Sequence, residues 1–574
     1  MTARARLYRK RLLASGALIL WAPLALAQAV EKHPAPILHG IGTARLDAGA
    51  LLQGSTDATP FGVGLSGVML VDAHENGAAR AKTGPGVDIS QAGATAQGIA
   101  PKLAPFLGQP LSYKLISEIT AAVTAHYREN GRSLVLVTVP PQEITTGILQ
   151  VNVNTFRLEA PPVLAGDATD GDHVARQIRL RPGEEVDTAK LMDDVTWLNL
   201  NPFRKVAVAF EPGQTADGTR LTLQVQSKRP WSAYVGASNA GADGTGAVRV
   251  FGGFNVSALP WKDQQLSYQI NMAPGSGGFW DTEGTKGYVS HGLSYFVPVT
   301  LDSGFRFKAT AGLTHVSSFA EPDAVFSTGT TTDGATFELS FPLPRKSGTW
   351  ALVPELYLGL GQDDYSRRQY FGGAIFATEA SRLTRVTLGL RSSLNGRLFG
   401  RPTHGDFDLS LVTGRQEGAT DSDFSYAKFR IGQEISLEGG AQVALRLAGQ
   451  YAPGDLHPLE QLGLGGDSTV RGYGANAVSS QSAVSASVEY RLTPIDVPIG
   501  GKTGQLRPQL FADWGFAAAT ATTASAHLAG IGLGGTLSVG EDWEASLTLA
   551  NALNDAGSVE AGDVSVALRL IARF

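Results

Sequence analysis

The sequence predicts an all-β transmembrane antiparallel β-barrel preceded by two small α/β domains. Three observations lead to this fold class. The chain opens with an export signal, it has no later run of 18 or more apolar residues, and period-two alternation replaces helical spacing after Trp231. Backbone groups in lipid need internal hydrogen bonds, which helices or closed barrels provide. We therefore expect a barrel over residues 230–574 and α/β domains over residues 85–160 and 161–229.

Residues 1–27 have the pattern of a secretory signal peptide. Arginines and a lysine crowd residues 4–11, residues 12–24 are apolar, and Ala25-Leu26-Ala27 forms a small-x-small cleavage site. The apolar run is too short to favour a membrane anchor. We expect the mature chain to begin at Gln28 and to leave the cytoplasm.

The composition excludes several kinds of site. The chain has no cysteine, so it has no disulfide, no thiolate metal ligand and no cysteine nucleophile. A formal net charge of −5 argues against a nucleic-acid partner. His126, His173 and His291 lack the spacing of metal ligands, and no glycine-rich stretch has the residues of a phosphate loop. We expect no enzymatic activity, no metal and no cofactor.

Residues 28–84 are rich in Gly, Ala and Asp and show little periodicity. We interpret this segment as a linker and expect much of it to be mobile. A weak helical pattern around Leu46, Leu51 and Leu52 is broken by Gly49 and Gly54, so any helix here would be short.

The first α/β domain is predicted by a change of period. Apolar residues recur at helical spacing from Leu115 to Tyr127, with Ser112 placed as the N-cap and Gly131 at the end. A β-branched run over residues 134–139 and an alternating run over residues 148–153 then predict two strands.

The second α/β domain repeats this order. Asp187 caps a predicted helix that carries Leu191, Val195 and Leu198, and strands follow over residues 206–210 and 221–226. No grouping of acid, base and nucleophile stands out in either domain. We therefore interpret both α/β domains as small binding modules.

The final segment of the chain carries the strongest barrel pattern. From Val564 to Phe574 apolar residues occupy one face, and Arg569 and Arg573 occupy the other. Each arginine would cost about 2–4 kcal/mol if it faced lipid at mid-depth, so that face must meet water or polar partners. A strand that ends the chain on an aromatic residue favours an outer-membrane protein, with Phe574 as the C-terminal assembly signal.

Two short motifs resemble a known superfamily. Val470-Arg471-Gly472-Tyr473 is similar to the VRGY or VRGF motif of barrel proteins related to the outer-membrane insertase BamA. Phe511-Ala512-Asp513-Trp514-Gly515 is similar to the Phe/Gly-x-Asp-x-Gly motif of a later strand in the same proteins. The resemblance implies that the first motif lies on a long loop that folds back into the lumen.

The N-terminal half of the chain makes the resemblance more specific, because its motifs are similar to those of two-partner secretion transporters. Residues 141–149 resemble the P-x-Q-x-x-x-x-G-x-L segment of their first POTRA domain, and residues 198–202 resemble their second. Membership implies sixteen strands, although 345 residues would equally allow fourteen or eighteen strands at about 9–11 residues per crossing. It also implies an N-terminal plug helix, for which this sequence has only the weak pattern described above.

Arg471 and Asp513 are the pair most strongly expected to carry function. A guanidinium can bind a carboxylate through two hydrogen bonds, so Arg471 could fix its loop to an inward-facing Asp513. Gly472 would allow a sharp turn, and Gly515 would let another segment lie close to its strand. The alternative is an ordinary loop arginine and a turn aspartate. In a water-filled lumen the pair would be screened and would contribute about 1 kcal/mol or less.

Gln142 and Gly147 are candidate substrate contacts, although both have structural explanations as well. A turn favours glycine, and a glutamine side chain can satisfy backbone groups. A POTRA-type sheet could also bind an incoming chain through its edge by β-augmentation, which requires no particular sequence.

The resemblance implies a bacterial outer-membrane pore with its POTRA domains in the periplasm. Such a pore would capture an unfolded exoprotein and pass it through the barrel. The implied partners are that exoprotein, outer-membrane lipid, periplasmic chaperones and the barrel assembly machinery. A barrel-assembly insertase and a passive porin remain the alternatives, and the sequence does not identify the cargo.

Overall fold

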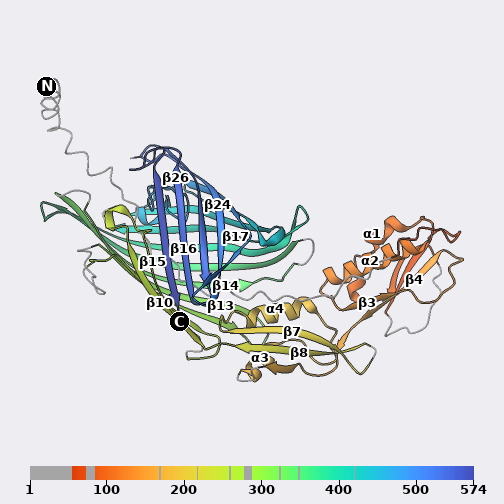
Figure 1. Cartoon of the computed structure of the whole chain (residues 1–574). Helices are drawn as coiled ribbons and strands as arrows, with labels where there is room; N and C mark the ends of the chain where they lie inside the picture. The colour runs from red at the N-terminus through yellow and green to blue at the C-terminus, as the bar shows by residue number, and fades with distance from the viewer. Residues whose placement is uncertain are drawn as a thin grey trace.

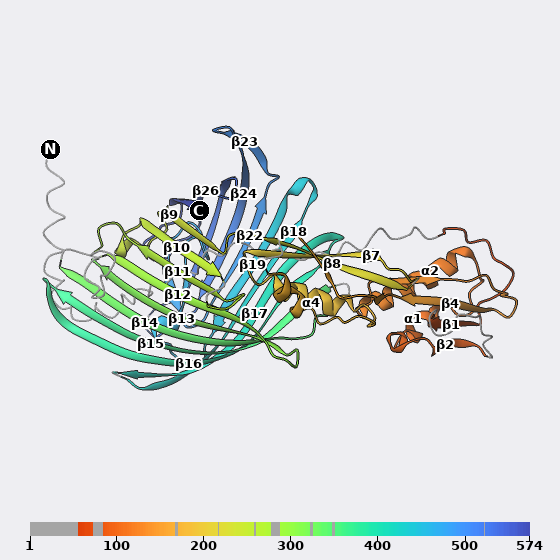
Figure 2. The same ribbon diagram turned by 90° about the horizontal axis from the view of Figure 1, so that it is seen from below.

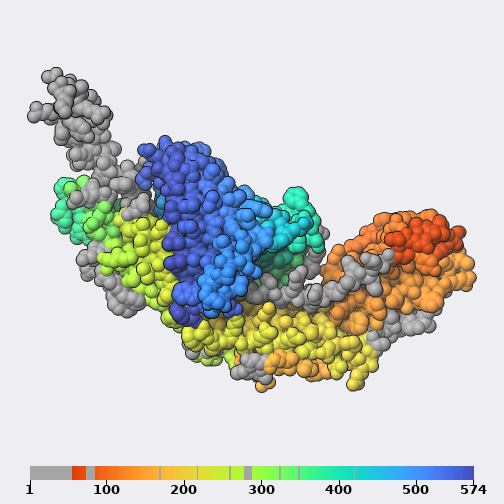
Figure 3. Space-filling view, viewed as in Figure 1, coloured from red at the N-terminus to blue at the C-terminus, as the bar shows by residue number. Residues whose placement is uncertain are grey.

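The computed structural model describes residues 55–72, 84–166, 170–215, 217–257, 260–276, 287–321, 325–346, 350–418, 420–521 and 523–574. These residues form a large barrel and a periplasmic arm of two α/β domains, which extends away below the barrel (Figures 1 and 3). The signal peptide and the weak pattern near Leu46 lie outside the described residues. No helix of the described residues is both long and apolar enough to cross a membrane.

The first α/β domain is a four-stranded sheet covered by helices. Its strands are β1 (Gly67–Asp72), β2 (Gly86–Gln91), β3 (Val135–Thr138) and β4 (Ile148–Thr155), in the order β2-β1-β4-β3. The short helices η2 (Ala94–Ala96), α1 (Ala100–Leu103) and η3 (Ala104–Phe106) precede α2 (Tyr113–Glu129). The predicted cap of α2 is confirmed, since the Ser112 hydroxyl accepts a hydrogen bond from the Leu115 N–H at 3.2 Å.

The prediction that residues 28–84 are only a linker is wrong for the part that the structure describes. Strand β1 lies at the centre of the sheet, where it pairs in parallel with both β2 and β4. Val68 and Leu70 are fully buried in the core with α2. The strand escaped prediction because Gly67–Val71 are buried on both faces, so it lacks the alternation of a half-exposed strand. The first domain therefore begins before residue 85.

The second domain packs two helices on its own sheet. Strands β5 (Arg157–Leu158), β6 (Val163–Gly166) and β7 (Arg204–Pro212) all pair with the central β8 (Gly218–Ser227). Its helices are α3 (Gly171–Gln177) and α4 (Thr188–Leu198). Asp187 caps α4 as predicted, by accepting from the Lys190 N–H at 2.9 Å. Because β5 belongs to this sheet, the boundary falls a few residues before the predicted position of 160.

The two domains are joined by direct hydrogen bonds. The Gly131 carbonyl accepts from both the backbone N–H and the hydroxyl of Thr188, at 2.8 and 2.9 Å. Arg132 forms ion pairs with Glu185 and Asp187 at 2.9 and 3.0 Å. Gly131 has φ +81°, so the residue predicted to end α2 also makes the turn into the joint.

The described residues of the barrel form a closed antiparallel sheet of sixteen strands, which confirms the predicted fold class. One of these strands consists of β22 and β23, which are separated by a short break. The strands are β9 (Trp231–Ser238), β10 (Arg249–Ser257), β11 (Gln265–Met272), β12 (Tyr288–Thr300), β13 (Arg306–Ala320), β14 (Phe326–Pro342), β15 (Trp350–Phe371), β16 (Ala374–Leu398), β17 (Arg401–Gly418), β18 (Ser422–Ser436), β19 (Gln442–Tyr451), β22 (Ala483–Arg491), β23 (Ile495–Ile499), β24 (Lys502–Ala517), β25 (Ala526–Val539), β26 (Trp543–Ala552) and β27 (Val564–Arg573).

The barrel closes where the last strand meets the first. Strands β27 and β9 pair from Arg569↔Ser238 to Arg573↔Tyr234. Phe574 extends the ladder, because its N–H donates to the Ala233 carbonyl at 2.8 Å. At the other end the Asn239 side chain donates to the Val566 carbonyl at 2.7 Å and accepts from the Leu568 N–H at 2.7 Å. The terminal aromatic residue thus completes the closure, while its role as an assembly signal stays a prediction.

An apolar band covers the outside of the barrel. It includes Val250, Leu293, Leu313, Phe337, Leu358, Leu360, Val386, Leu388, Leu411, Ile431, Leu447, Val488, Leu510, Leu533, Leu549, Val566 and Leu568. On β15 the outward face becomes polar beyond Leu360, and Asp364 pairs there with Arg382 of β16 at 2.6 Å. With 22 and 25 residues, β15 and β16 are much longer than the roughly 9–11 residues needed to cross lipid. At the outer end β16 extends past β17, whose last residue pairs with Ser381, while β14 begins level with the end of β15; β14–β16 form one long side of the wall in Figure 2.

The second domain is docked on the periplasmic turns through buried charges. Asp263, in the turn between β10 and β11, accepts a hydrogen bond from Nη2 of Arg204 at 2.9 Å and forms an ion pair with Nη1 at 2.8 Å. His173 and Asn201 lie 2.6 and 3.1 Å from the same carboxylate. A second contact joins the fully buried Asp194 of α4 to Arg306 of β13 at 2.7 Å.

We predict that a fragment of residues 85–228 does not fold, whereas a fragment of residues 55–228 does. The shorter fragment lacks β1 and exposes the core that Val68 and Leu70 cover. Each lost side chain removes about 1.5–3 kcal/mol of burial from a fold with only about 5–15 kcal/mol of stability. Circular dichroism during thermal unfolding tests this. A cooperative transition in the shorter fragment would contradict the position given to β1.

We predict that Asp263→Asn releases the second domain from the barrel. The substitution leaves the Arg204 side chain, which is 1% exposed, without the charge of its nearest carboxylate, at a cost of about 3–5 kcal/mol. Hydrogen exchange at residues 199–204 should rise sharply. Lys262→Ala is the matched control, because Lys262 lies in the same turn and its partly exposed pair with Asp170 of the second domain should contribute little.

The same contact predicts how docking depends on pH. Burial raises the pKa of Asp263, but hydrogen bonds from His173 and the charge of Arg204 outweigh it and lower the pKa from 3.8 to about 2. A lowered pKa stabilises the docked state above the ordinary value, and this contribution is lost as the pH falls from about 4 to about 2. Hydrogen exchange at residues 199–204 between pH 5 and pH 2.5 should show protection that weakens below pH 4 in the natural protein. Asp263→Asn should lack this dependence.

Candidate functional site

A long hairpin lies inside the barrel. Residues 452–482, between β19 and β22, return from the extracellular end of β19 into the lumen, and we call them the lumenal hairpin. Its two short strands are β20 (Leu462–Leu464) and β21 (Val478–Ser480), which pair with each other. A 3-10 helix (Pro458–Glu460) precedes β20. The tip carries the Val470–Tyr473 motif, at the position that the resemblance implied.

Arg471 is bound to the wall by most of its donors. Its Nε and Nη2 atoms donate to the two carboxylate oxygens of Asp513 at 2.7 and 2.8 Å, and its backbone N–H donates to Asp513 at 3.0 Å. Nη1 donates to Glu489 at 2.9 Å, and Nη2 also lies 3.3 Å from the Ser487 hydroxyl. The guanidinium carbon sits 3.4 Å from the centre of the Phe511 ring. We call Arg471, Asp513 and Glu489 the lumen latch.

The lumen latch differs from the expected pair in two respects. Sequence reasoning missed Glu489, which also accepts from Arg491 of the same strand at 2.7 Å. The expectation of a water-screened pair is also wrong, because the side chains of Arg471 and Asp513 are 8% and 1% exposed. Loss of one partner would leave buried charges uncompensated, which costs about 3–5 kcal/mol rather than about 1 kcal/mol. Glu489 could have been suspected as an acidic residue at an inward position of alternating β22.

Glycines let the tip lie directly against the wall. A Cβ atom on Gly530 of β25 would lie 2.0 Å from the Arg471 carbonyl oxygen. At Gly515 of β24 it would lie 2.9 Å from a methyl group of Val470, so the close approach predicted at Gly515 is confirmed. Gly472 has φ +103°, and its own Cβ would meet the backbone of β26 at 3.2 Å.

Tyr473 attaches the C-terminal side of the hairpin tip to the wall. Its hydroxyl lies 2.9 Å from the Ala529 carbonyl oxygen and 2.8 Å from that of Asn554. Val470 and Tyr473 also join an apolar cluster with Leu464 of the hairpin and with Leu528 of the wall. All four residues of the motif therefore contact the wall. Val470 does so by apolar packing, Arg471 by its ion pairs, Gly472 by close backbone approach and Tyr473 by the hydrogen bonds of its hydroxyl.

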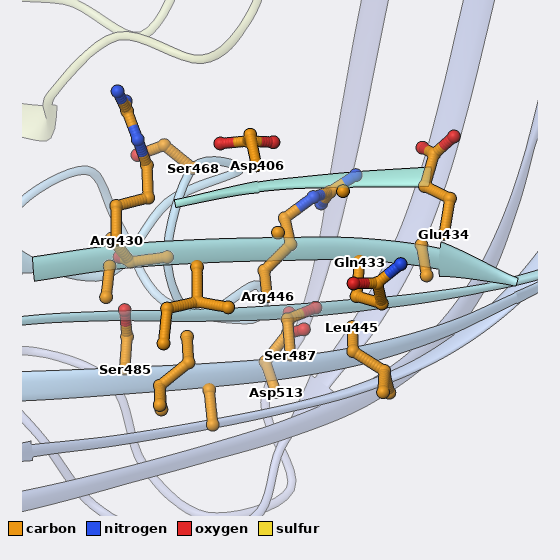
Figure 4. Close-up of a pocket in the computed structure, with 18 of the residues that line it drawn as sticks. Asp406, Arg430, Gln433, Glu434, Leu445, Arg446, Ser468, Ser485, Ser487 and Asp513 are labelled. Carbon is orange, nitrogen blue, oxygen red and sulfur yellow. The ribbon is translucent and has the colours of Figure 1, made fainter. Parts of the chain in front are cut away.

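Two water-accessible cavities border the tip. One, of about 570 Å³, lies toward β17–β19 and is lined by Arg430, Arg446 and Asp513 (Figure 4). The other, of about 600 Å³, lies toward β24–β27 and is lined by Arg507 and Arg569. Both are bordered by Arg471, so the hairpin divides the lumen instead of filling it.

The structure gives Gln142 and Gly147 contacts within the chain. The Gln142 side chain accepts from the Gln150 N–H at 2.7 Å and donates to the Gln150 carbonyl at 2.8 Å. The Gly147 carbonyl accepts from the Ser66 N–H at 2.7 Å, and a Cβ on Gly147 would lie 2.4 Å from the Gly64 carbonyl oxygen. Both residues hold the loop before β4, and their suggested contact with substrate stays a prediction.

Sequence comparison places this architecture in a family. The profile of haemolysin secretion/activation proteins (ShlB/FhaC/HecB) matches residues 217–537, which is more than half of the chain. The chain belongs to this family. The ShlB-type POTRA domain profile matches residues 88–155 of the first α/β domain. We therefore call the two α/β domains the POTRA-like domains from here on.

Individual family relatives are distant in sequence and similar in fold. The heme/hemopexin transporter protein HuxB of Haemophilus influenzae is 20% identical over 414 residues, 67% of each chain. The outer membrane transporter CdiB of Dickeya dadantii is 22% identical over 384 residues, 64% of each chain. The structure of CdiB from Escherichia coli covers 93% of this chain and 94% of its own at 17% identity, with a TM-score of 0.68. CdiB from Acinetobacter baumannii covers 95% of both chains at 16% identity, with a TM-score of 0.63.

We predict that Gly530→Ala detaches the hairpin tip from the wall. The added methyl group would collide with backbone that is fixed by the latch, so the tip must move. Limited trypsin digestion in detergent should then cleave after Arg471, as mapped by mass spectrometry. Gly535→Ala on the same strand is the matched control, since its nearest neighbour would be 3.4 Å away. Equal resistance of both variants would contradict the close approach.

Proposed function

We propose that this chain is the outer-membrane transporter of a two-partner secretion pair. An unfolded exoprotein is captured in the periplasm by the POTRA-like domains and leaves through the barrel without nucleotide or covalent chemistry. The proposal is supported above all by the family match, which runs from the last strand of the second POTRA-like domain through most of the barrel. The barrel lies in the outer membrane, and the POTRA-like domains lie in the periplasm.

The periplasmic arm offers a surface suited to an unfolded chain. Within the described residues of the first sheet, β2 and β3 each pair on one side only. A strand edge binds main chain by hydrogen bonds and makes no demand on side chains, which suits a cargo that is still unfolded. Periplasmic chaperones would keep such a cargo unfolded before it arrives.

The lumenal hairpin supports transport of a chain over passive solute diffusion. Porins enclose a water-filled channel, whereas here a hairpin crosses the lumen, is bound to its wall and leaves only two separate cavities. An extended polypeptide would have to share the two cavities with this hairpin or displace it. In this proposal Arg471 is the positioning residue that sets where the hairpin stands during transport.

We predict that Arg471→Ala strongly reduces secretion while the barrel still assembles. The sixteen-strand ladder does not depend on the hairpin, but Asp513 and Glu489 lose the cation that places the tip. Arg471→Lys should rescue poorly because an ammonium cannot form the bidentate contact. The measurement is cargo in the medium, normalised to heat-modifiable barrel in the membrane fraction.

Arg430→Ala is the matched control for this experiment. Arg430 lines the same cavity, and within the described chain it has no carboxylate within ion-pair distance. Its loss should leave secretion nearly unchanged. Normal secretion by Arg471→Ala would falsify the proposed positioning role. A general fall of other outer-membrane barrels on depletion of this protein would favour an assembly insertase instead.

A further inference from the structure

The lumenal hairpin has a second attachment, on a stretch of wall that β19 separates from the strands of the lumen latch. Residues 452–460, which we call the arm, lead from β19 toward the tip. The arm packs on the inner face of β15–β18, whereas the tip packs on β22 and β24–β26. The hairpin therefore touches two separate stretches of wall.

Glu460 is the charged centre of this attachment. Its residue is 4% exposed, and one carboxylate oxygen lies 3.1 Å from Nη1 of Arg385 on β16. The Tyr426 hydroxyl of β18 donates to the other oxygen. The Glu460 backbone carbonyl accepts from the Gln450 side chain at 2.7 Å. Arg385 also pairs with Asp363 of β15, so one cation serves two carboxylates.

Apolar contacts surround this charge. Leu456 and Leu459 of the arm join a buried cluster with Leu383 and Val412 of the wall. The His457 ring stands edge-on to Tyr365 of β15, with the ring centres 4.9 Å apart. A buried carboxylate within such a cluster is stable only while its cation stays in place.

We propose that Glu460 is a second ionic anchor, which holds the arm of the lumenal hairpin against β15–β18 independently of Arg471. The two anchors share no residue. Arg471 binds carboxylates of β22 and β24, and Glu460 binds an arginine of β16 and a phenol of β18. The arm can therefore leave its wall while the tip stays attached, which gives the hairpin an intermediate state between closed and released.

The charges of Glu460, Arg385 and Asp363 predict that substitutions of Glu460 and Arg385 detach the arm to different extents. Glu460→Gln removes the ion pair but keeps an oxygen that can accept from Arg385 and Tyr426, so the arm should loosen moderately. Arg385→Met leaves Glu460 and Asp363 as neighbouring carboxylates without a cation, so the arm should detach more completely. Combining the two substitutions removes one of those charges. The double variant should be less disturbed than Arg385→Met alone, which loss of packing would not produce.

The natural absence of cysteine makes the test direct. Leu456→Cys reports on the arm and Val470→Cys reports on the tip, and each is labelled on intact cells with a membrane-impermeant maleimide. In the Glu460→Gln background, labelling at position 456 should rise on the order of tenfold while labelling at position 470 stays low. In the Arg471→Ala background the pattern should reverse. Asp364→Asn is the matched control, because its pair with Arg382 lies on the outer face of the same two strands.

Each outcome bears on the proposal. Unchanged labelling at position 456 in both Glu460→Gln and Arg385→Met would overturn the anchor. Equal rises at both positions in either background would overturn the independence of the two attachments. Cargo secretion, measured in parallel, rests on the proposed function. Selective exposure of position 456 with no secreted cargo in any background would count against the secretion role and leave the anchor intact.

Discussion

A strand in hydrocarbon must place every backbone N–H and carbonyl in a hydrogen bond, because lipid provides no substitute. This constraint requires β27 to meet β9, and it explains why Phe574 and the Asn239 side chain extend the ladder at its two ends. Since β9 follows directly from the second POTRA-like domain, closure also brings that domain beneath the barrel. The Asp263 and Asp194 contacts then fix its orientation. The placement of the POTRA-like domains at the periplasmic mouth thus follows from their connection to β9 and from these contacts.

Inside the barrel, buried charged pairs determine the position of the lumenal hairpin. The lumenal hairpin contributes Arg471 and Glu460, and each lies among partners of opposite charge from the wall. A carboxylate or guanidinium removed from water is costly alone and tolerable when paired, so each anchor makes partial release unfavourable. Close packing at Gly515 and Gly530 makes the fit of the tip specific. The hairpin is thus held by a few strong contacts, and a small number of substitutions should move it.

Much of the fold could be predicted because its patterns are local. The Ser112 and Asp187 caps, the helical spacing of α2 and α4 and the alternation of β27 are all explicit in the sequence. Strand β1 was missed because both of its faces are buried, so it has no polar face to alternate with. The pairing of Arg471 with Asp513 rested on a family resemblance, since 42 residues separate them. Glu460, Arg385 and Asp263 became visible only through tertiary contacts that no local pattern records, whereas Glu489 had only its inward position on β22 as a signal.

The unequal lengths of the strands have a consequence for an emerging chain. Strands β15 and β16 contain 22 and 25 residues, whereas β9, β26 and β27 contain 8, 10 and 10. Because β16 continues outward beyond the Ser381↔Gly418 pair, the outer rim stands higher at the β15–β16 hairpin than beside it, while the strands of the seam are short. Excluded volume alone bends a polymer leaving such an opening toward the low side. A protein emerging here would be steered sideways along the cell surface, and its first folded segment would form beside the seam.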